Sequence, residues 1–556
     1  MAGRPGGVRC ESSESRQEQG ADQAGRPARR RAREPPGAAA AAMRGRIMVP
    51  TVLLVPFLLL AELHSQRPPT ADESLWYIDG DRAGWGAAGG SRASGLALAL
   101  GRLRRHRRAG VPPHVPATIT LPAGAHWLEE GVVLRGDLDS NLVIEGGGSG
   151  GLPVVSGGKV LSRGWTERSA PDGSALWVRQ TNASEPFSKL YHGSGGGEYS
   201  VSRLPRNTSE FLRWEAPLAN CSPTCPASNA FGFRFRAGDI LPSWNLSDAA
   251  VCTFASWDAQ WRSIASIDWT TRSLRFNEAM AYPVGSEATN SGRRYAVENV
   301  YPPQAPGQWH RSASGLVSYR PRPGEDIRSF APIAPQRRSV FVLDGVENVS
   351  LRGLAIRHGS DGGNRNAGRT EQPSLINISY SRDIKIVGCE LTAGGGGGIS
   401  ISGRSASITV RSSYLHDLGG DGVTIGETRV DELRRRHDSN YTVPTPVDVE
   451  IANSVISHIG QVFLLQPSGI SIGGTRVTVT ACDISFSPYA GITGGTGNSI
   501  TRSHIHDYGF LLSDLGGVYI AGQRCSHAGD CPLDSTQVSD NIIRRSNFFA
   551  HGGNGV

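Results

Sequence analysis

The chain has 556 residues, of which 38% are hydrophobic, 7% aromatic and 19% charged, and its regular supply of Val, Ile and Leu excludes global disorder. Its 71 Gly follow no Gly-X-Y period, which excludes collagen. The formal net charge is +7, but residues 1–46 hold ten Arg against five acidic residues and so carry five of these charges. The rest is nearly neutral, so no nucleic-acid partner is expected. Two Arg clusters, at residues 102–108 and 434–436, are interpreted as solvated loops.

The first 65 residues have the composition of a leader. Residues 1–42 are rich in Ala, Gly, Arg and Glu and are expected to be disordered. Residues 43–65 have a basic start, the short apolar stretch Ile47–Ala61 and a small residue near the end, as secretory signal peptides do. The stretch is shorter than the roughly 20 residues of a membrane span. We expect a secreted or cell-surface protein with no stable membrane span after signal cleavage; an uncleaved signal anchor is the alternative.

Two features that follow the leader agree with secretion. The first is a set of N-x-S/T sequons, which are candidate glycosylation sites: Asn182, Asn207, Asn220, Asn245, Asn348, Asn377 and Asn440. The second is two pairs of closely spaced cysteines in loops rich in Gly, Pro and Ser, Cys221 with Cys225 and Cys525 with Cys531. Such pairs are expected to form disulfides in an oxidising compartment.

Short β-branched runs recur from residue 349 onward, and most are followed by a shorter run that opens with Gly. Equivalent residues of neighbouring runs are separated by at least 21 to 24 residues, the length of one coil, and longer steps indicate loop insertions. The runs are Val349–Ile356, Ile384–Leu391, Ile408–Leu415, Val449–Ile456, Val477–Ile484, Asn498–Ile505 and Thr536–Ile543.

The repeat predicts a parallel β-helix, because the runs alternate with period 2 and are separated by Gly-rich corners without a helical pattern. A leucine-rich repeat would show a leucine ladder, and a sandwich would need hairpin turns between neighbouring strands. The alignment places Cys389 and Cys482 in one column, three coils and roughly 14 Å apart. That separation is too long for a disulfide, so both are expected to be buried thiols.

An ordered set of motifs extends from about Trp76 to the C-terminus. It comprises Leu75–Gly80, Ile119–Gly124, Ser156–Trp165, Tyr295–Val300, Gly307–Asp326, Tyr489–Gly494 and Ser513–Gly522. In this order the motifs resemble those of secreted, pectin-lyase-like carbohydrate-active proteins, the group that contains glycoside hydrolase family 141. The resemblance implies an all-β chain, a right-handed parallel β-helix that is interrupted by an antiparallel β insert and carries a substrate groove on its flank.

The same resemblance divides the chain and suggests its activity. Residues 66–139 would form the first coils, residues 140–335 the insert and residues 336–556 the β-helix core. The implied activity is hydrolysis of a plant or algal polysaccharide or oligosaccharide. We also expect a monomer that uses no cofactor. In the family, a second catalytic acid lies one coil after the stretch SDLGG, which is residues 513–517 here, and this chain ends as that coil would begin. We therefore expect a C-terminally truncated sequence.

Glycoside hydrolysis usually needs two carboxyl groups that flank the bond. Asp514 is the first candidate, and the alternative is an Asp that caps the backbone of a turn. If the chain is complete, Asp507 or Asp421 must act as the second acid. Asp514 stands out because its equivalents in other coils are small or neutral: Gly395, Gly419, Gln466, Pro488 and Gly552.

Other side chains of the coils can contact a sugar. The pairs His416-Asp417 and His506-Asp507 occupy equivalent corners, with His458 in the same column as the two acids. Such pairs orient a hydroxyl group or relay a proton, although they also cap turns. Tyr489 and Tyr519 can stack on sugar faces or lie buried in the coil wall. No metal site is expected, because Asp clusters are sparse.

Two other functions fit the same fold. A polysaccharide lyase needs a cationic base and a group that neutralises a uronate, for which the helix offers Arg404, Arg476, Arg502 and Lys385. A non-catalytic adhesin or carbohydrate-binding solenoid at the cell surface needs neither. The fold alone does not separate these functions from a hydrolase.

Overall fold

The structure is a computed structural model whose chain divides into two units, residues 1–67 and 68–556. It describes residues 76–79, 95–148, 150–192, 197–205, 210–220, 224–286, 289, 293–427, 433–434, 437–438, 441–495, 497–520 and 536–546, all in the second unit. The expected leader and signal peptide, residues 1–42 and 43–65, lie outside the described residues. No described helix is both long and apolar enough to cross a membrane.

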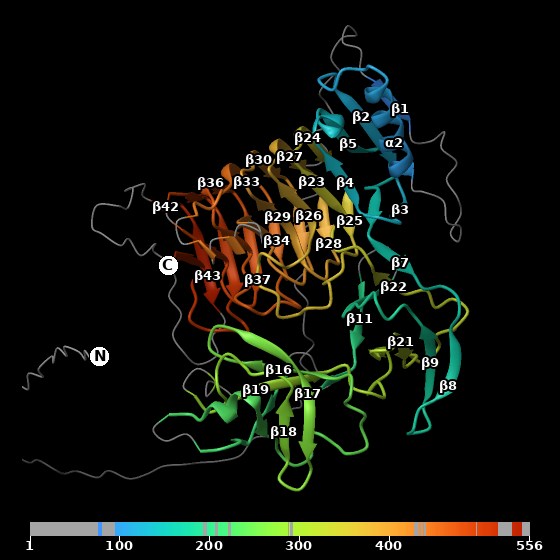
Figure 1. Ribbon diagram of the computed structural model, residues 1–556, viewed down its shortest axis with the longest axis vertical. Coiled ribbons are helices and arrows are strands. Elements are labelled where there is room, and N and C mark those ends of the chain that lie inside the picture. The colour runs from blue at the N-terminus through green and yellow to red at the C-terminus, as the bar shows by residue number, and fades with distance from the viewer. Residues whose placement is uncertain are drawn as a thin grey trace, which may run out of the picture. The chain divides into compact units, whose positions relative to one another are not determined.

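Three parallel sheets, which we call A, B and C, form a β-helix in which each complete coil contributes one strand to each sheet (Figure 1). Sheet A contains β1 (Trp76–Asp79), β2 (Ala117–Pro122), β5 (Leu142–Gly147), β24 (Glu347–Arg352), β27 (Arg382–Val387), β30 (Ala406–Arg411), β33 (Val447–Ala452), β36 (Thr475–Thr480), β39 (Ser499–Thr501) and β42 (Gln537–Ser539). Sheet B contains β3 (Ala125–Trp127), β6 (Val154–Ser156), β25 (Ala355–Arg357), β28 (Glu390–Thr392), β31 (Tyr414–His416), β34 (Val455–Ser457), β37 (Asp483–Ser487), β40 (His504–Tyr508) and β43 (Ile542–Ser546). Sheet C contains β4 (Val132–Arg135), β23 (Phe341–Asp344), β26 (Ser374–Ser379), β29 (Gly397–Ser402), β32 (Val423–Gly426), β35 (Ile470–Ile472), β38 (Ile492–Gly494) and β41 (Val518–Ile520).

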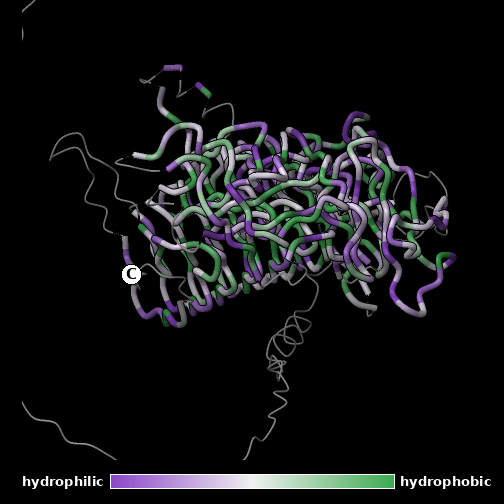
Figure 2. The backbone as a smooth tube through the Cα atoms, turned by 90° about the horizontal axis from the view of Figure 1, so that it is seen from below, coloured by the Kyte–Doolittle hydropathy of each residue, from purple (hydrophilic) through white to green (hydrophobic). Residues whose placement is uncertain are grey.

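Alternating side chains explain why these runs form coils. Every second residue points inward and stacks on its equivalent in the next coil, as Ile384, Ile408, Val449 and Val477 do in sheet A. All four are at most 1% exposed. Figure 2 shows hydrophobic and hydrophilic residues alternating along the backbone. Because a single coil cannot bury its apolar face, the stack of coils forms the core.

A corner column between sheets A and B confirms the alignment of the repeats. The backbone N–H of Cys389 donates to the Ser413 hydroxyl, that of Ser413 to Ser454 and that of Cys482 to Ser503, each at 3.2 Å. Cys389 and Cys482 are buried free thiols, as predicted. Burial raises the pKa of both thiols to about 11, so neither is a reactive thiolate at neutral pH.

Helix α2 (Gly95–Arg108) corrects the interpretation of residues 102–108 as a solvated loop. Arg104 pairs with Asp139 at 2.7 Å in η3 (Asp137–Asp139), and the buried Arg107 donates to the backbone oxygen of Ser140 at 2.6 Å. Arg104 and Arg107 are therefore part of the first coil's packing, while Arg102, Arg105 and Arg108 are exposed; the Leu spacing could have indicated the helix. The apolar side chains that α2 places in the solenoid core are Leu96, Ala99, Leu100 and Leu103.

The insert extends from β7 (Gly158–Val160) to β22 (Ile333–Pro335). It begins later than residue 140, because β5 and β6 pair with strands of sheets A and B. Its strands pair antiparallel except for β11 with β20. One sheet adds β8 (Thr166–Ser169), β9 (Ala175–Gln180), β10 (Leu190–His192), β11 (Gly197–Val201), β20 (Gln308–Arg311) and β21 (Leu316–Tyr319) to β7 and β22. The other contains β12 (Arg203–Leu204), β13 (Leu212–Arg213), β14 (Ala216–Pro217), β15 (Gly232–Arg234), β16 (Ala250–Phe254), β17 (Ala259–Asp268), β18 (Ser273–Phe276) and β19 (Arg294–Glu298), with η4 (Ala227–Phe231) beside it.

The hairpin between β16 and β17 docks the insert on the corner between sheets B and C. Asp258 forms an isolated antiparallel bridge with Leu465. The backbone N–H and the hydroxyl of Ser513 both donate to the backbone oxygen of Ser256, at 2.6 and 2.8 Å. These contacts fix the wall of the insert against the corner loops of the coils.

Candidate functional site

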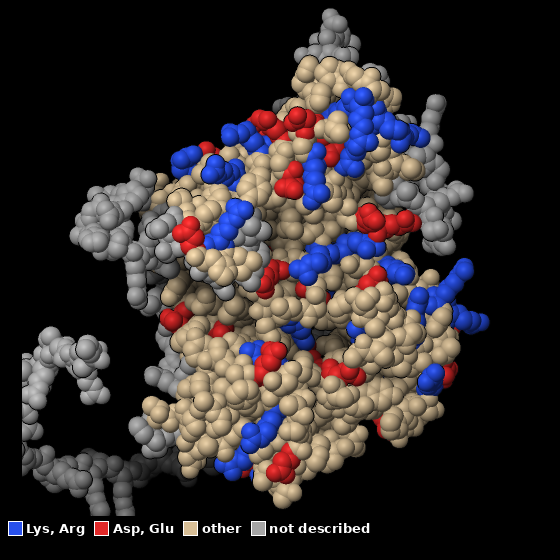
Figure 3. Space-filling view, in the orientation of Figure 1, with Lys and Arg blue, Asp and Glu red and all other residues tan. Residues whose placement is uncertain are grey.

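A cavity of about 880 Å³ lies between the insert and the corner of sheets B and C. Figure 3 shows the surface hollowed between the solenoid and the insert, with acidic and basic side chains around the hollow. The insert contributes Phe211 and Phe254, and the corner loops contribute Gln461 and Leu511. The cavity therefore has both apolar walls and groups that form hydrogen bonds.

Ion pairs hold the charged side chains that line this cavity. Glu298 lies 2.5 Å from Arg365 and 3.7 Å from Arg203, and Lys189 lies 2.9 Å from Glu198. Sequence analysis did not identify these residues: Lys189 and Glu198 are nine residues apart, but the partners of Glu298 come from segments distant in the chain. No local spacing signals such a cluster.

Asp514 is an exposed residue at the start of the turn into β41, with a φ of 59°. The registers of sheet C confirm that Gly395, Gly419, Gln466 and Pro488 are its equivalents, while Gly552 lies outside the described residues. Among these positions from Gly395 onward Asp514 is the one ionisable side chain, while the same register places Arg337 four residues before the first residue of β23. It does not line the cavity, although Phe510 and Leu511 of the same loop do.

The two candidate tyrosines differ in accessibility. Tyr489 is 3% exposed, and its hydroxyl donates to the backbone oxygen of Asp514 at 2.7 Å. Burial and the nearby Tyr519 and Asp514 raise the pKa of Tyr489, so it stays protonated. Its ring belongs to the coil wall, whereas Tyr519 is only partly buried and can still contact a ligand.

Asp421 is buried, and its carboxylate is held by neighbouring side chains and backbone. It is 2% exposed, and Arg369 lies 2.8 Å from one carboxylate oxygen. The Thr424 hydroxyl donates to the same oxygen as Arg369 at 3.1 Å, and the backbone N–H of Ser468 donates to the other oxygen at 2.9 Å. Because both oxygens are engaged, the geometry does not favour Asp421 as the second acid.

His416 lies between two carboxylates on the outer face of sheet B. Its Nδ1 is 2.7 Å from Asp417, its Nε2 is 3.3 Å from Glu390, and Arg357 pairs with Glu390. The hydrogen bond from His416 and the pairing with Arg357 lower the pKa of Glu390 to about 2. Burial opposes a charged His416, but hydrogen bonds to Asp417 and Glu390 outweigh it and raise its pKa. We call Arg357, Glu390, Tyr414, His416 and Asp417 the Glu390 cluster.

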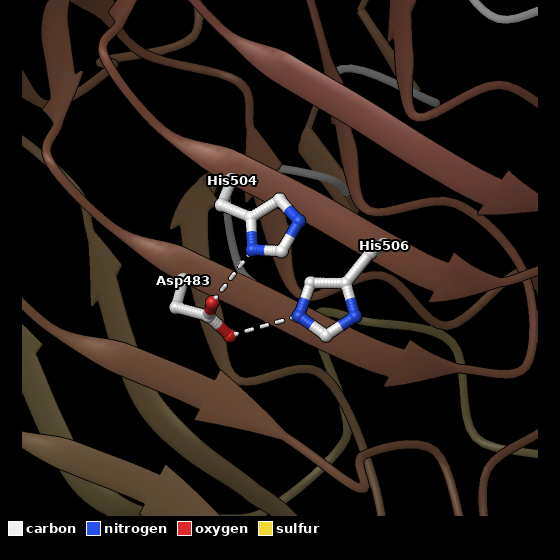
Figure 4. Close-up of side chains that lie close together, drawn as sticks. All are labelled: Asp483, His504 and His506. Atoms are coloured by element: carbon white, nitrogen blue, oxygen red, sulfur yellow. Dashed lines mark hydrogen bonds and ion pairs between the residues drawn. The ribbon is translucent and has the colours of Figure 1, made fainter. Parts of the chain in front are cut away.

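A second cluster lies at the same strand positions further along sheet B, and we call it the Asp483 cluster (Figure 4). His504 Nδ1 lies 3.0 Å from one oxygen of Asp483, and His506 Nε2 lies 3.2 Å from the other. Asp507, 8% exposed, lies 2.7 Å from His506 Nδ1. The expected pairing of His506 with Asp507 is present, but Asp483 and His504 were missed; the His-x-His alternation within one strand was the available signal.

The corner column that follows these strands also agrees with the predicted alignment. Asp417, His458, Phe486 and Asp507 occupy it, with φ between 50° and 52°. His458 stacks on Phe486 with a centroid separation of 4.3 Å. Burial lowers the pKa of His458, which Asp417 partly opposes, so His458 is a neutral ring at neutral pH.

Several sequence predictions concern residues at the surface or outside the described part. Asn182, Asn220, Asn245 and Asn348 are exposed and Asn377 is partly buried, while Asn207 and Asn440 are not described. Cys225 is disulfide-bonded, whereas Cys221, Cys525 and Cys531 lie outside the described residues. Glycosylation and the two cysteine pairings therefore stay predictions.

Comparison with known proteins identifies the architecture. A family model for the right-handed β-helix region matches residues 438–556, and no curated protein matches the chain. A solved structure described as a glycoside hydrolase superposes with a TM-score of 0.62 at 16% identity, covering 81% of this chain and 85% of its own. The complex of XylC with xylose gives a TM-score of 0.39 at 13% identity over 73% and 59% of the two chains. The parallel registers and the family match together show that this chain is a right-handed parallel β-helix protein with a β insert.

Proposed function

We propose that the protein hydrolyses a glycosidic linkage of a plant or algal polysaccharide or oligosaccharide, with Asp514 as one of two catalytic carboxyl groups. The observation that carries the proposal is the position of Asp514, an exposed carboxylate in a column of small or neutral residues, next to the insert. The motif resemblance and the similarity to a structure described as a glycoside hydrolase support it.

The second carboxyl group is the one that the resemblance places one coil beyond the SDLGG stretch. Asp421 is enclosed by its hydrogen-bond partners, and Asp507 is buried against His506. A retaining enzyme would hold the two carboxyl groups about 5–5.5 Å apart and an inverting enzyme about 6.5–9.5 Å apart. The adjoining cavity, with Glu298, Gln461 and aromatic walls, would bind the sugar units next to the cleaved bond.

The arginines that a lyase would use are found elsewhere on the coil. Arg476 pairs with Asp448 at 2.7 Å, and Arg502 donates to the Thr480 hydroxyl at 3.0 Å. Both belong to sheet A or to the residue that follows its strand, whereas Asp514 precedes a strand of sheet C. Arg476 and Arg502 are therefore not placed to act together with Asp514, whereas Lys189, Arg203 and Arg365 bring positive charge to the adjoining cavity.

The test is release of reducing ends from a panel of plant and algal polysaccharides by the protein at its full natural length. Asp514→Asn is expected to lower kcat at least about 1,000-fold, because removing a catalytic group costs several kcal/mol in the transition state. Asp540→Asn is the matched control, since Asp540 is also exposed and has a φ of 58°. Full activity of Asp514→Asn would overturn the proposal. An unsaturated, ultraviolet-absorbing product would indicate a lyase, and glycan binding without any product would indicate a binding solenoid.

A further inference from the structure

We propose that Asp483, His504 and His506 bind one divalent transition-metal ion of the Zn²⁺ class on the outer face of sheet B. The proposal does not depend on the hydrolase assignment or on Asp514. Sequence analysis expects no metal site, and these three residues form the group of potential ligands that stands out among the described residues.

Strand register brings the three ligands together. His504 and His506 are two residues apart in β40, so their side chains point to the same face of the sheet. Asp483 on β37 is directly paired with His504. The three ligand atoms all lie within 4.8 Å of one another. The ligand atoms of a tetrahedral zinc site are separated by about 3.3 Å, given metal–ligand distances near 2.0–2.2 Å. The separations of 3.0 and 3.2 Å between the imidazole nitrogens and Asp483 are close to this value.

Asp507 orients His506 for metal binding. Its carboxylate lies 2.7 Å from His506 Nδ1, and because a carboxylate accepts hydrogen bonds, Nδ1 is the donor of this pair. The lone pair of Nε2 then faces Asp483. A carboxylate behind a histidine ligand is the usual arrangement around protein-bound zinc, because it fixes the tautomer and makes the ring a better ligand. A lone pair on Nε2 and the carboxylate of Asp483 repel each other unless a positive charge lies between them. A proton on the ring supplies this charge in the Glu390 cluster, and a metal ion would supply it here.

The Glu390 cluster shows how the negative charge of a carboxylate in the same arrangement is neutralised without a metal. There Arg357 pairs with the carboxylate, and Tyr414 occupies the position of His504. In the Asp483 cluster, the strand position of Arg357 is taken by Ser457. Among the described residues, the ion-pair partners of Asp483 are the two imidazoles.

The ligand set and the exposure of the site define the class of ion. Two imidazoles with one carboxylate suit Zn²⁺ and its neighbours, whereas Ca²⁺ and Mg²⁺ prefer oxygen ligands. The side chains of Asp483 and His504 are 41% and 35% exposed, so water can complete the coordination. Because the ligands belong to two successive coils, the bound ion would also fasten β37 to β40.

The experiment is calorimetric titration of the chelator-treated full chain with ZnCl₂, with thermal unfolding as a second readout. The wild type is expected to bind one equivalent with a dissociation constant in the micromolar range or below, and its Tm is expected to rise with zinc concentration. His504→Tyr, which introduces the side chain found at Tyr414, is expected to weaken binding at least about 100-fold and to remove the Tm shift.

Two further variants decide between this site and another. Asp483→Asn is expected to weaken binding as strongly as His504→Tyr, while His416→Asn in the Glu390 cluster is expected to leave affinity and stoichiometry unchanged. Matching circular dichroism spectra in chelator show whether each variant is folded. A wild-type chain that binds no zinc, or a folded His504→Tyr chain that binds it normally, would overturn the proposal.

Discussion

Glu390 and Asp483 occupy the same strand position of sheet B, three coils apart. Each faces the Nε2 atom of a histidine two positions along the next strand, and each histidine has an aspartate 2.7 Å from its Nδ1. Apart from the length of the central acid, the two clusters differ in one cationic side chain and in one aromatic ring. The Glu390 cluster contains Arg357 and the ring of Tyr414, whereas the Asp483 cluster has serine and histidine at these positions.

This difference shows that in a solenoid the fold fixes where side chains lie, while the residues at those positions determine their chemistry. Backbone register repeats the same placement of side chains in each coil, so the geometry of a cluster is inherited from the fold. The chemistry depends on which charge compensates the carboxylate. A covalently attached guanidinium makes the Glu390 cluster a stabilising ion pair, while a second imidazole makes the Asp483 cluster a ligand set.

The largest expected effect concerns the pH dependence of the Glu390 cluster. The pKa of Glu390 is lowered from 4.5 to about 2, first by the hydrogen bond from His416 and then by Arg357. A lowered pKa means that the ionised form stabilises the folded state above pH 4.5, and that this stability is lost as the pH falls towards 2. The shift corresponds to about 3 kcal/mol. In urea titrations, the stability difference between wild type and Glu390→Gln is expected to fall by more than half between pH 7 and pH 3.

Glu450→Gln provides the matched control for this measurement. Glu450 pairs with Arg411 at 2.7 Å, but both side chains are at least 36% exposed. Exposed pairs contribute about 0–1 kcal/mol, so this variant should stay within that range of the wild type at all pH values. A pH-independent difference for Glu390→Gln would show that Glu390 gains no stabilisation from its charge.

Removing Arg357 is expected to have the next largest effect. The side chains of Arg357 and Glu390 are 11% and 24% exposed. Arg357→Ser therefore leaves a largely buried carboxylate with less positive charge beside it. We expect a loss of about 2 kcal/mol in the free energy of unfolding, less than the 3–5 kcal/mol of a fully buried pair. Arg476→Ser, which breaks an exposed pair with Asp448, should leave the free energy of unfolding nearly unchanged.

A double-mutant cycle separates charge from packing in this pair. If Arg357 acts by compensating the charge of Glu390, then the double variant with Arg357→Ser and Glu390→Gln loses much less stability than the sum of the losses in the two single variants. Additive costs would mean that Arg357 contributes through packing of its alkyl chain, and the contrast with the Asp483 cluster would then not be one of charge.

Sequence reasoning predicts the features of this molecule that repeat. The column through Cys389, Ser413, Ser454, Cys482 and Ser503 was aligned correctly because each coil imposes the same alternation and the same small corner residue. The equivalents of Asp514 were found for the same reason. A periodic pattern fixes both the strand and the face on which a side chain lies.

Features that depend on contacts between non-equivalent segments were not predicted. The cavity residues Arg203, Glu298 and Arg365 come from two insert strands and a corner loop, and no spacing in the chain relates them. The Asp483 cluster was half recognised, since the adjacent His506 and Asp507 were noticed but their partner lies 23 residues away. The histidine pair in β40 became informative only when strand register placed Asp483 beside it.

The smallest expected effect concerns His416 and has the opposite pH dependence to that of Glu390. Its pKa is raised: burial opposes the charged ring, but hydrogen bonds to Asp417 and Glu390 outweigh burial. A raised pKa gives stability that is complete below the ordinary value of 6.5 and is lost as the pH rises through the folded-state pKa. His416→Asn should therefore cost about 1.5 kcal/mol at pH 5.5, the lower end of the range for a hydrogen bond to a charged group, and less at pH 9. His458→Asn is the control, because burial lowers the pKa of His458 and its neutral ring gives no such loss at high pH. A cost for His416→Asn that grows with pH would mean that the neutral ring is the form that stabilises the cluster, and the likeness between the two clusters would then be one of shape alone.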